Sequence, residues 1–130
     1  MFRMFGGSAS IPGSPRYNPF NGNISSWDTS NVTNMQWMFY YNNVFDQDIS
    51  GWDTGSVLTF QEMFDHASTF NQDIGSWDTS SATDMEGMFQ FASSFDQDIS
   101  SWNVSNVINY DSFDAGTSTS WTSDEKPTFS

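Results

Sequence analysis

The sequence contains no cysteine, which excludes a disulfide framework and any metal site built from thiolates. It has little positive charge: Arg3, Arg16 and Lys126 stand against 16 acidic residues, and the formal net charge is −13. Because lysine and arginine must neutralise phosphate when a protein binds nucleic acid, nucleic acid is not an expected partner. No run approaches the roughly 18 apolar residues of a membrane-spanning helix, so no membrane insertion is expected either.

Residues suited to catalysis are equally scarce. His66 is the single histidine, and it has neither a cysteine near it nor a recognisable Ser-His-Asp order around it. We expect it to lie in an exposed turn. Carboxylates are abundant, but they return at regular intervals along the chain, which is typical of a structural role rather than of one active site. The sequence therefore predicts that the protein is not an enzyme.

Large apolar residues are present at a fixed interval of 25 residues. Three columns share this period without an insertion: Phe20, Phe45, Phe70 and Phe95; Ile24, Ile49, Ile74 and Ile99; Trp27, Trp52, Trp77 and Trp102. A repeat of about 20 to 50 residues is typical of stacked repeat architectures, because each unit buries its apolar face only against its neighbours.

Each repeat has two halves with different patterns. In the first half, Asp48, Ile49 and Ser50 alternate polar and apolar, which predicts a short strand parallel to its neighbours. The second half covers residues 30–39. Its apolar residues follow the helical pattern i, i+3, i+6, i+7 at Val32, Met35, Met38 and Phe39, which predicts a two-turn helix. The predicted fold is an α/β repeat solenoid, leucine-rich-repeat-like, with short parallel strands on one side, short helices on the other and about four coils.

The two ends of the chain depart from the repeat. Residues 1–19 are expected to hold a partial N-terminal repeat, in which Met1 and Met4 match the second half, and a loop rich in Gly, Ser and Pro. Either the chain begins in the middle of a repeat, or the incomplete coil is an N-terminal cap. Residues 20–114 form the repeats, and residues 115–130 are expected to be a C-terminal cap with Trp121, and Phe129 as a further candidate, over the last layer.

The phrase Phe-Asn-Gln-Asp-Ile-x-x-Trp-Asp-Thr-Ser-x-x-Thr-x-Met-x-x-Met-Phe occupies residues 70–89. It resembles the 25-residue repeat of the BspA-like leucine-rich-repeat surface proteins, also grouped as a mycoplasma-type repeat family of unknown function. The resemblance implies a leucine-rich-repeat-like solenoid that is displayed on cell surfaces and takes part in adhesion. It transfers no catalytic residue.

An acidic ladder is the most suggestive polar feature. The candidate metal ligands are Asp46, Asp48, Asp73, Asp96 and Asp98. Carboxylates stacked on adjacent coils repel one another, and Ca²⁺, which takes several oxygen ligands, is one way to relieve the repulsion. The alternative is that each aspartate accepts backbone N–H groups in its own turn.

Aromatic residues outside the core columns form a second candidate site. Trp37, Tyr40, Tyr41 and Phe91 could contact a sugar or a protein partner, or pack against neighbouring coils. A threonine ladder, Thr29, Thr54 and Thr79, could form a flat surface that binds ice, but Val104 interrupts it and turn formation explains the same position. Asn23, Asn31 and Asn103 match the N-glycosylation acceptor pattern.

Taken together, the sequence favours a non-catalytic cell-surface or secreted repeat protein for adhesion or recognition, with a protein or glycan on another surface as its partner. The alternative is a structural subunit that assembles head-to-tail into a filament, because the open end of a repeat stack exposes an unpaired edge. No cofactor is expected other than the Ca²⁺ considered above.

Overall fold

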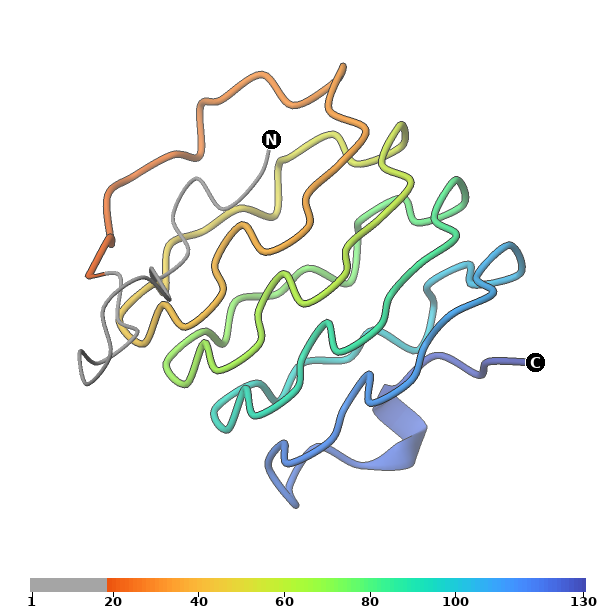
Figure 1. The fold of residues 1–130 in the computed structure, drawn as a ribbon. Coiled ribbons are helices and arrows are strands. Elements are labelled where there is room, and N and C mark those ends of the chain that lie inside the picture. The colour runs from red at the N-terminus through yellow and green to blue at the C-terminus, as the bar shows by residue number, and fades with distance from the viewer. Residues whose placement is uncertain (1–18) are drawn as a thin grey trace, which may run out of the picture.

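A computed structural model describes residues 19–130 of the chain (Figure 1). The chain winds in successive coils that lie side by side, so that each residue lies next to the residue about 25 positions further on. The C-terminal segment closes one end of the stack. The partial repeat and loop predicted for residues 1–19 lie outside the described residues, apart from Pro19.

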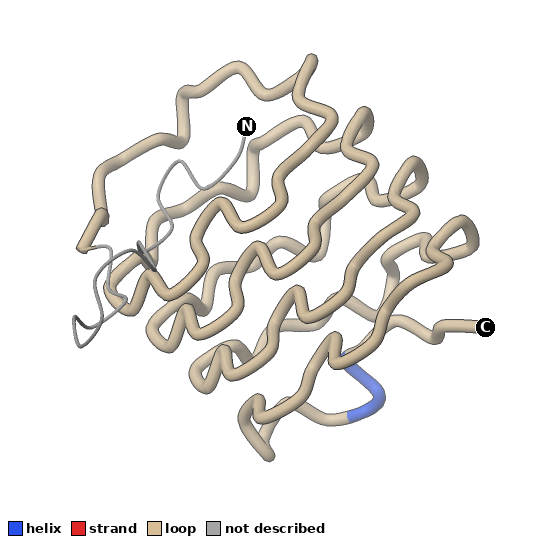
Figure 2. The backbone as a smooth tube through the Cα atoms, in the orientation of Figure 1, coloured by secondary structure: helices blue, strands red, loops and turns tan. Residues whose placement is uncertain are grey.

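Regular secondary structure is almost absent from residues 19–130. Its single helix is η1, a 3-10 helix at Ser123–Glu125, and the remaining backbone consists of turns and irregular segments (Figure 2). The parallel pairing is limited to the isolated bridges Asn34↔Thr59, Thr59↔Asp84 and Asp84↔Asn109. The predicted α/β architecture, with short strands on one side and short helices on the other, is therefore wrong.

The predicted strand around Ile49 is replaced by a turn. The N–H of Trp52 donates to the carbonyl oxygen of Ile49 at 3.2 Å, and Ser50 donates its N–H to Asp48 Oδ1 at 2.9 Å. Aspartate followed two residues later by serine or glycine favours such a turn, because the side chain offers the backbone a local acceptor. Ile49 still points into the core, where it is fully buried.

The predicted helix is replaced by a run of turns. Within the first described coil, the N–H groups of Met38, Tyr40 and Asn42 bond to carbonyls three residues earlier. Trp37 and Tyr41 have φ values of 60° and 56°, which no right-handed helix allows. A run of turns places residues three and four apart on one face, as a helix does, so the apolar spacing did not distinguish the two.

Alternate N–H groups in these turns bond to the next coil. We call the residues that make these bonds, with their equivalents in the last coil, the turn ladder; it comprises residues 35–41, 59–66, 84–91 and 109–116. Four bonds of 2.8 to 3.0 Å join each pair of coils: Met35 to Thr59, Trp37 to Gln61, Phe39 to Met63, Tyr41 to Asp65, and the same four positions 25 and 50 residues later. The ladder satisfies backbone groups that a helix would have satisfied internally.

Aromatic columns fill the interior of the stack. Phe45, Phe70 and Phe95 stack at centroid distances of 6.0 and 5.9 Å, and Trp52, Trp77 and Trp102 stack at 6.5 and 6.3 Å. A third column, Phe39, Phe64 and Phe89, lies between them with spacings of 5.5 and 5.6 Å. All these rings are buried. The 25-residue period predicted from the sequence is thus the spacing of the stacked core.

Buried polar groups link each coil to the next. The hydroxyl of Thr54 donates to the carbonyl oxygen of Asp78 at 2.9 Å, and Thr29 and Thr79 repeat this bond. The three threonines are at most 4% exposed, so they form no flat surface for ice. No buried side-chain nitrogen or oxygen in residues 19–130 lacks a hydrogen-bond partner.

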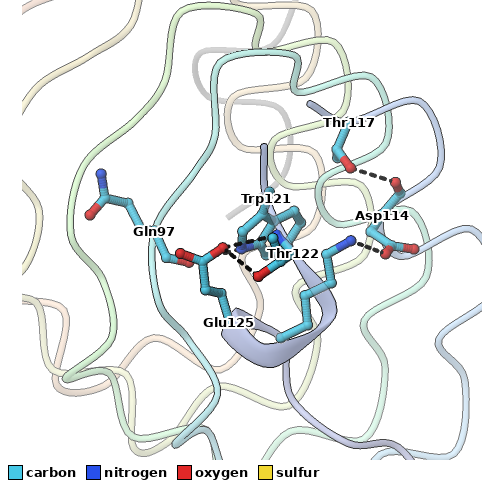
Figure 3. Close-up of polar contacts among 7 residues, drawn as sticks. Gln97, Asp114, Thr117, Trp121, Thr122 and Glu125 are labelled. Atoms are coloured by element: carbon cyan, nitrogen blue, oxygen red, sulfur yellow. Dashed lines mark hydrogen bonds and ion pairs between the residues drawn. The ribbon is translucent and has the colours of Figure 1, made fainter. Parts of the chain in front are cut away.

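The C-terminal segment packs on the last core layer, and Figure 3 shows its polar contacts. Trp121 is buried, packs edge-on against Phe89 and Phe95, and donates its indole N–H to the carbonyl oxygen of Gln97 at 2.9 Å. Lys126 lies over the Trp121 ring and forms an ion pair with Asp114 at 2.7 Å. The side chain of Glu125 accepts the N–H of Thr122, which holds the first turn of η1.

Candidate functional site

A column of rings lies at the end of the turn ladder, at positions 41, 66, 91 and 116. Tyr41 and His66 stack with centroids 4.0 Å apart and planes 11° apart, and His66 and Phe91 follow at 4.6 Å with a tilt of 43°. The column ends at Gly116, where an added Cβ would lie 2.4 Å from Phe91 Cδ1. The Phe91 ring therefore packs directly on the glycine backbone. We call Tyr40, Tyr41, His66 and Phe91 the ring column, since Tyr40 contacts Tyr41 at 4.7 Å.

The backbone at the ring column is left-handed in every coil. Tyr41, His66, Phe91 and Gly116 have φ values of 56°, 58°, 54° and 71°. Glycine adopts this conformation without steric cost, and other residues pay about 1 kcal/mol or more for it. The position accepts glycine in one coil, yet three coils carry a ring there. Ring stacking, at about 0.5 to 1.5 kcal/mol per pair, offsets part of that cost.

A buried carboxyl group lies beneath the histidine. Asp65 has a side chain only 4% exposed, and its Oδ1 lies 2.6 Å from His66 Nδ1. Burial raises the pKa of Asp65 to about 6, against the opposing effect of His66 and with a smaller rise from the charge of Glu62. Asp65 is thus a buried carboxyl group that is protonated more readily than an exposed aspartate.

The aromatic residues predicted as a binding site are partly brought together. Tyr40, Tyr41 and Phe91 meet in the ring column, whereas Trp37 lies one turn earlier and donates its N–H to Gln61. His66, expected in an exposed turn, is instead the centre of the column and only 33% exposed. Its place in the column was not predicted from the sequence, although its position 25 residues from both Tyr41 and Phe91 is a signal that could have found it.

The aspartates predicted as calcium ligands are engaged in hydrogen bonds. Asp48 and Asp98 each accept the N–H and the hydroxyl of the serine two residues later, and Asp73 accepts the N–H of Gly75. The side-chain bonds from Ser50 and Ser100, followed by the backbone bonds, hold the pKa values of Asp48 and Asp98 below their usual range. This is the alternative in which each carboxylate closes its own turn.

The remaining predicted ligands belong to an asparagine and aspartate ladder. Asp46 Oδ1 accepts the N–H of Asn71 at 3.0 Å and the side-chain amide of Gln72 at 2.9 Å. Asn71 accepts the N–H of Asp96 in the same way at 2.9 Å. Within residues 19–130 no three or more His, Asp or Glu side chains are grouped so that they could hold a metal ion.

The predicted glycosylation residues are exposed. Asn23 and Asn103 accept the N–H and hydroxyl of the serine two residues later, and Asn31 donates to Ser30. In Asn23 and Asn103 the oxygen, not the amide nitrogen that a glycan would modify, makes these bonds. The modification stays a prediction.

The geometry defines a class of protein: a stack of 25-residue coils held by backbone and side-chain ladders, with a ring column on its surface. The chain belongs to the family described as Mycoplasma protein of unknown function, DUF285, whose model matches residues 1–124. This agrees with the mycoplasma-type repeat family that the sequence resembled. No curated protein and no solved structure matches the chain. Residues 19–130 contain no helix with the length and apolar character needed to cross a bilayer.

Proposed function

We propose that this protein is a non-catalytic recognition protein, displayed on a cell surface or secreted, that binds a protein partner through the ring column. The observation that carries the proposal is the ring column itself. It places Tyr41, His66 and Phe91 side by side on the surface, on backbone conformations that glycine would adopt more easily. Aromatic residues are enriched at the centres of protein interfaces, where they supply apolar area with few rotatable bonds.

The stacking of the rings favours a protein over a glycan as the partner. A sugar packs on the face of an aromatic ring, but the faces of His66 lie against Tyr41 and Phe91, and one face of Phe91 lies on Gly116. The column therefore offers ring edges rather than ring faces, and Phe91, at 46%, is its most exposed ring. Such a surface suits a protein that supplies its own apolar side chains.

The surroundings of His66 support binding rather than catalysis. A histidine oriented by an aspartate can activate a nucleophile when a serine or cysteine lies within hydrogen-bond reach of its other nitrogen. Here the ring is enclosed between Tyr41 and Phe91, and residues 19–130 form no pocket that could hold a substrate. The Asp65–His66 pair instead fixes the orientation of the ring in the column.

A binding screen against arrays of extracellular proteins and of glycans tests this proposal. The variants are Phe91→Ser, which removes an exposed ring of the column, and Leu58→Ser, which removes an exposed apolar side chain elsewhere. We expect protein ligands that the Phe91→Ser variant loses and the Leu58→Ser variant keeps. Ligands that are all glycans, or protein binding that Phe91→Ser leaves unchanged, would contradict the proposal.

Assembly into a head-to-tail filament is the second candidate, and one observation favours it: the turn ladder ends in the last coil with unpaired backbone groups. Two observations place it second. Trp121 and Phe129 pack over the core at that end, and two copies would each bring a net charge of −13. Electron microscopy at high protein concentration tests it, since elongated particles are expected only for the filament.

A further inference from the structure

The last coil leaves one edge of the turn ladder open. In the three preceding coils, N–H groups at four alternate positions donate to the following coil, ending with Met85, Gly87, Phe89 and Phe91. The equivalent N–H groups of the last coil belong to Tyr110, Ser112, Asp114 and Gly116. None of these four has an acceptor in the described part of the chain. The C-terminal segment covers the side chains of the last layer without pairing with this backbone edge.

A fifth backbone group completes the pattern. Leu58, Thr83 and Ile108 each donate an N–H to the carbonyl oxygen of the residue 25 positions earlier, at 2.8 to 2.9 Å. The carbonyl oxygen of Ile108 has no such donor among residues 19–130. The open edge therefore consists of one acceptor, at Ile108, followed by four donors at alternate residues. An occupant must supply one N–H and then four carbonyl oxygens in the same direction.

Exposed apolar side chains accompany this edge. Ile108 is 86% exposed, the largest exposed fraction among the large hydrophobic residues described, and Tyr110 is 39% exposed. The ring of Tyr110 stacks on Phe129 at 4.4 Å, which holds it in place beside the backbone edge. An added segment would thus gain apolar contact as well as backbone hydrogen bonds, the two contributions that drive strand addition to a sheet edge.

The charges beside the edge indicate the chemistry of the occupant. Asp111 is exposed, and Asp114, though paired with Lys126, has a side chain that is 44% exposed. Lys126 is the single lysine or arginine of residues 19–130, against a net charge of −13 for the whole chain. A second copy of this protein would bring further negative charge to the edge, whereas a basic segment would neutralise it.

We propose that the open edge from Ile108 to Gly116 is a docking site for a basic polypeptide segment of a partner protein, which adds to the turn ladder in parallel register. This inference stands apart from the proposed function, because the edge does not use the rings of Tyr41, His66 or Phe91. The chain itself shows the conformation required: residues 108–115 occupy the corresponding edge of the coil before them.

The probe is a synthetic peptide with the sequence of residues 107–116, blocked at both ends, in which Asp111→Lys and Asp114→Lys make it basic. Amide hydrogen exchange, followed by NMR on the intact chain, reports each N–H separately. In the free protein we expect fast exchange at Tyr110, Ser112, Asp114 and Gly116 and slow exchange at Met85, Gly87 and Phe89. Saturating peptide is expected to slow the four edge amides by about tenfold or more.

Two variants and one control peptide make the test specific. Ile108→Ser removes an exposed contact of the edge and is expected to weaken binding several-fold, whereas Leu58→Ser, in the same column two coils earlier, is expected to leave it unchanged. The acidic peptide without the lysine substitutions is expected to bind more weakly. Slow exchange of the four amides in the free protein, or no slowing with the basic peptide, would overturn the proposal. So would slowing that follows protein concentration without peptide, since this identifies a second copy as the occupant.

Discussion

The indole N–H of Trp77 donates to the carbonyl oxygen of Ile49, 28 residues earlier, at 3.1 Å. Trp52 and Trp102 make the same bond to Ile24 and Ile74, so each tryptophan joins its own coil to the preceding one. A buried carbonyl and a buried indole thereby satisfy each other. This explains why a column of tryptophan, rather than of phenylalanine, recurs beside the phenylalanine columns.

The Trp77→Phe substitution tests this bond. It keeps an aromatic ring in the column but removes one of the two donors to the carbonyl of Ile49 and leaves only the N–H of Trp52, so we expect a loss of about 0.5 to 1.5 kcal/mol in the free energy of unfolding. Phe70→Leu is the matched control, because it shrinks a fully buried ring that makes no side-chain hydrogen bond, and a smaller loss is expected. Urea denaturation measures both. Equal losses at the two positions would show that ring volume, not the hydrogen bond, determines stability.

The pH dependence of stability follows from two opposite groups of aspartates. The folded state raises the pKa of Asp65 from 3.8 to about 6, so it binds a proton more tightly than the unfolded chain does. Stability is therefore expected to fall by about 1 to 3 kcal/mol as pH rises from about 4 to 6.

The turn aspartates act in the opposite direction. Hydrogen bonds from the serines two residues later, side chain first and backbone second, lower the pKa values of Asp28, Asp48, Asp78 and Asp98. Their contribution is lost as pH falls below about 4. The melting temperature should thus be highest near pH 4 to 5, and Asp65→Asn should flatten its fall at higher pH. A melting temperature that rises steadily from pH 4 to 7 in the native protein would contradict this assignment.

The asparagine and aspartate ladder predicts which substitutions at Asp46 are tolerated. Asn71 and Asp46 use one side-chain oxygen for the same task, accepting the N–H of the next coil. Asp46→Asn keeps that acceptor and should change the free energy of unfolding by less than about 0.5 kcal/mol, whereas Asp46→Ala should cost about 1 to 3 kcal/mol. The same melting curves with added Ca²⁺ and with a chelator should coincide. A shift with Ca²⁺ that Asp46→Asn abolishes would restore the calcium interpretation.

Gly116 limits the length of the ring column. A Cβ at this position would lie 2.4 Å from Phe91 Cδ1, and φ is +71°, so Gly116→Ala should cost about 1 to 3 kcal/mol and displace the Phe91 ring. Gly51→Ala is the matched control, because nothing lies within 4 Å of its added Cβ. Thermal unfolding and the NMR shifts of the Phe91 ring measure the effect. Identical behaviour of the two variants would show that the ring does not pack on Gly116.

Many of the core residues could be predicted from the sequence. The conformation of the backbone that carries them could not be predicted. Phe45, Ile49 and Trp52 recur at one interval, and a ring or branched side chain repeated at one interval must stack on its copies to leave water. The same periodicity did not reveal whether Met35, Met38 and Phe39 lie on a helix or on consecutive turns, because both place them on one face. Hydrogen bonds to the next coil decide between them, and these involve residues 24 positions away.

For the candidate functional surface, too, the sequence determined one part and the tertiary structure decided another. The sequence by itself left two interpretations of Asp48 and its copies open, calcium ligands or turn residues, and the tertiary structure showed that each accepts the N–H of the serine or glycine two residues later. The sequence also identified Tyr40, Tyr41 and Phe91 as rings outside the core. Only the tertiary structure placed His66 between Tyr41 and Phe91 and buried Asp65 beneath it, since these contacts exist only once residues 25 positions apart are stacked.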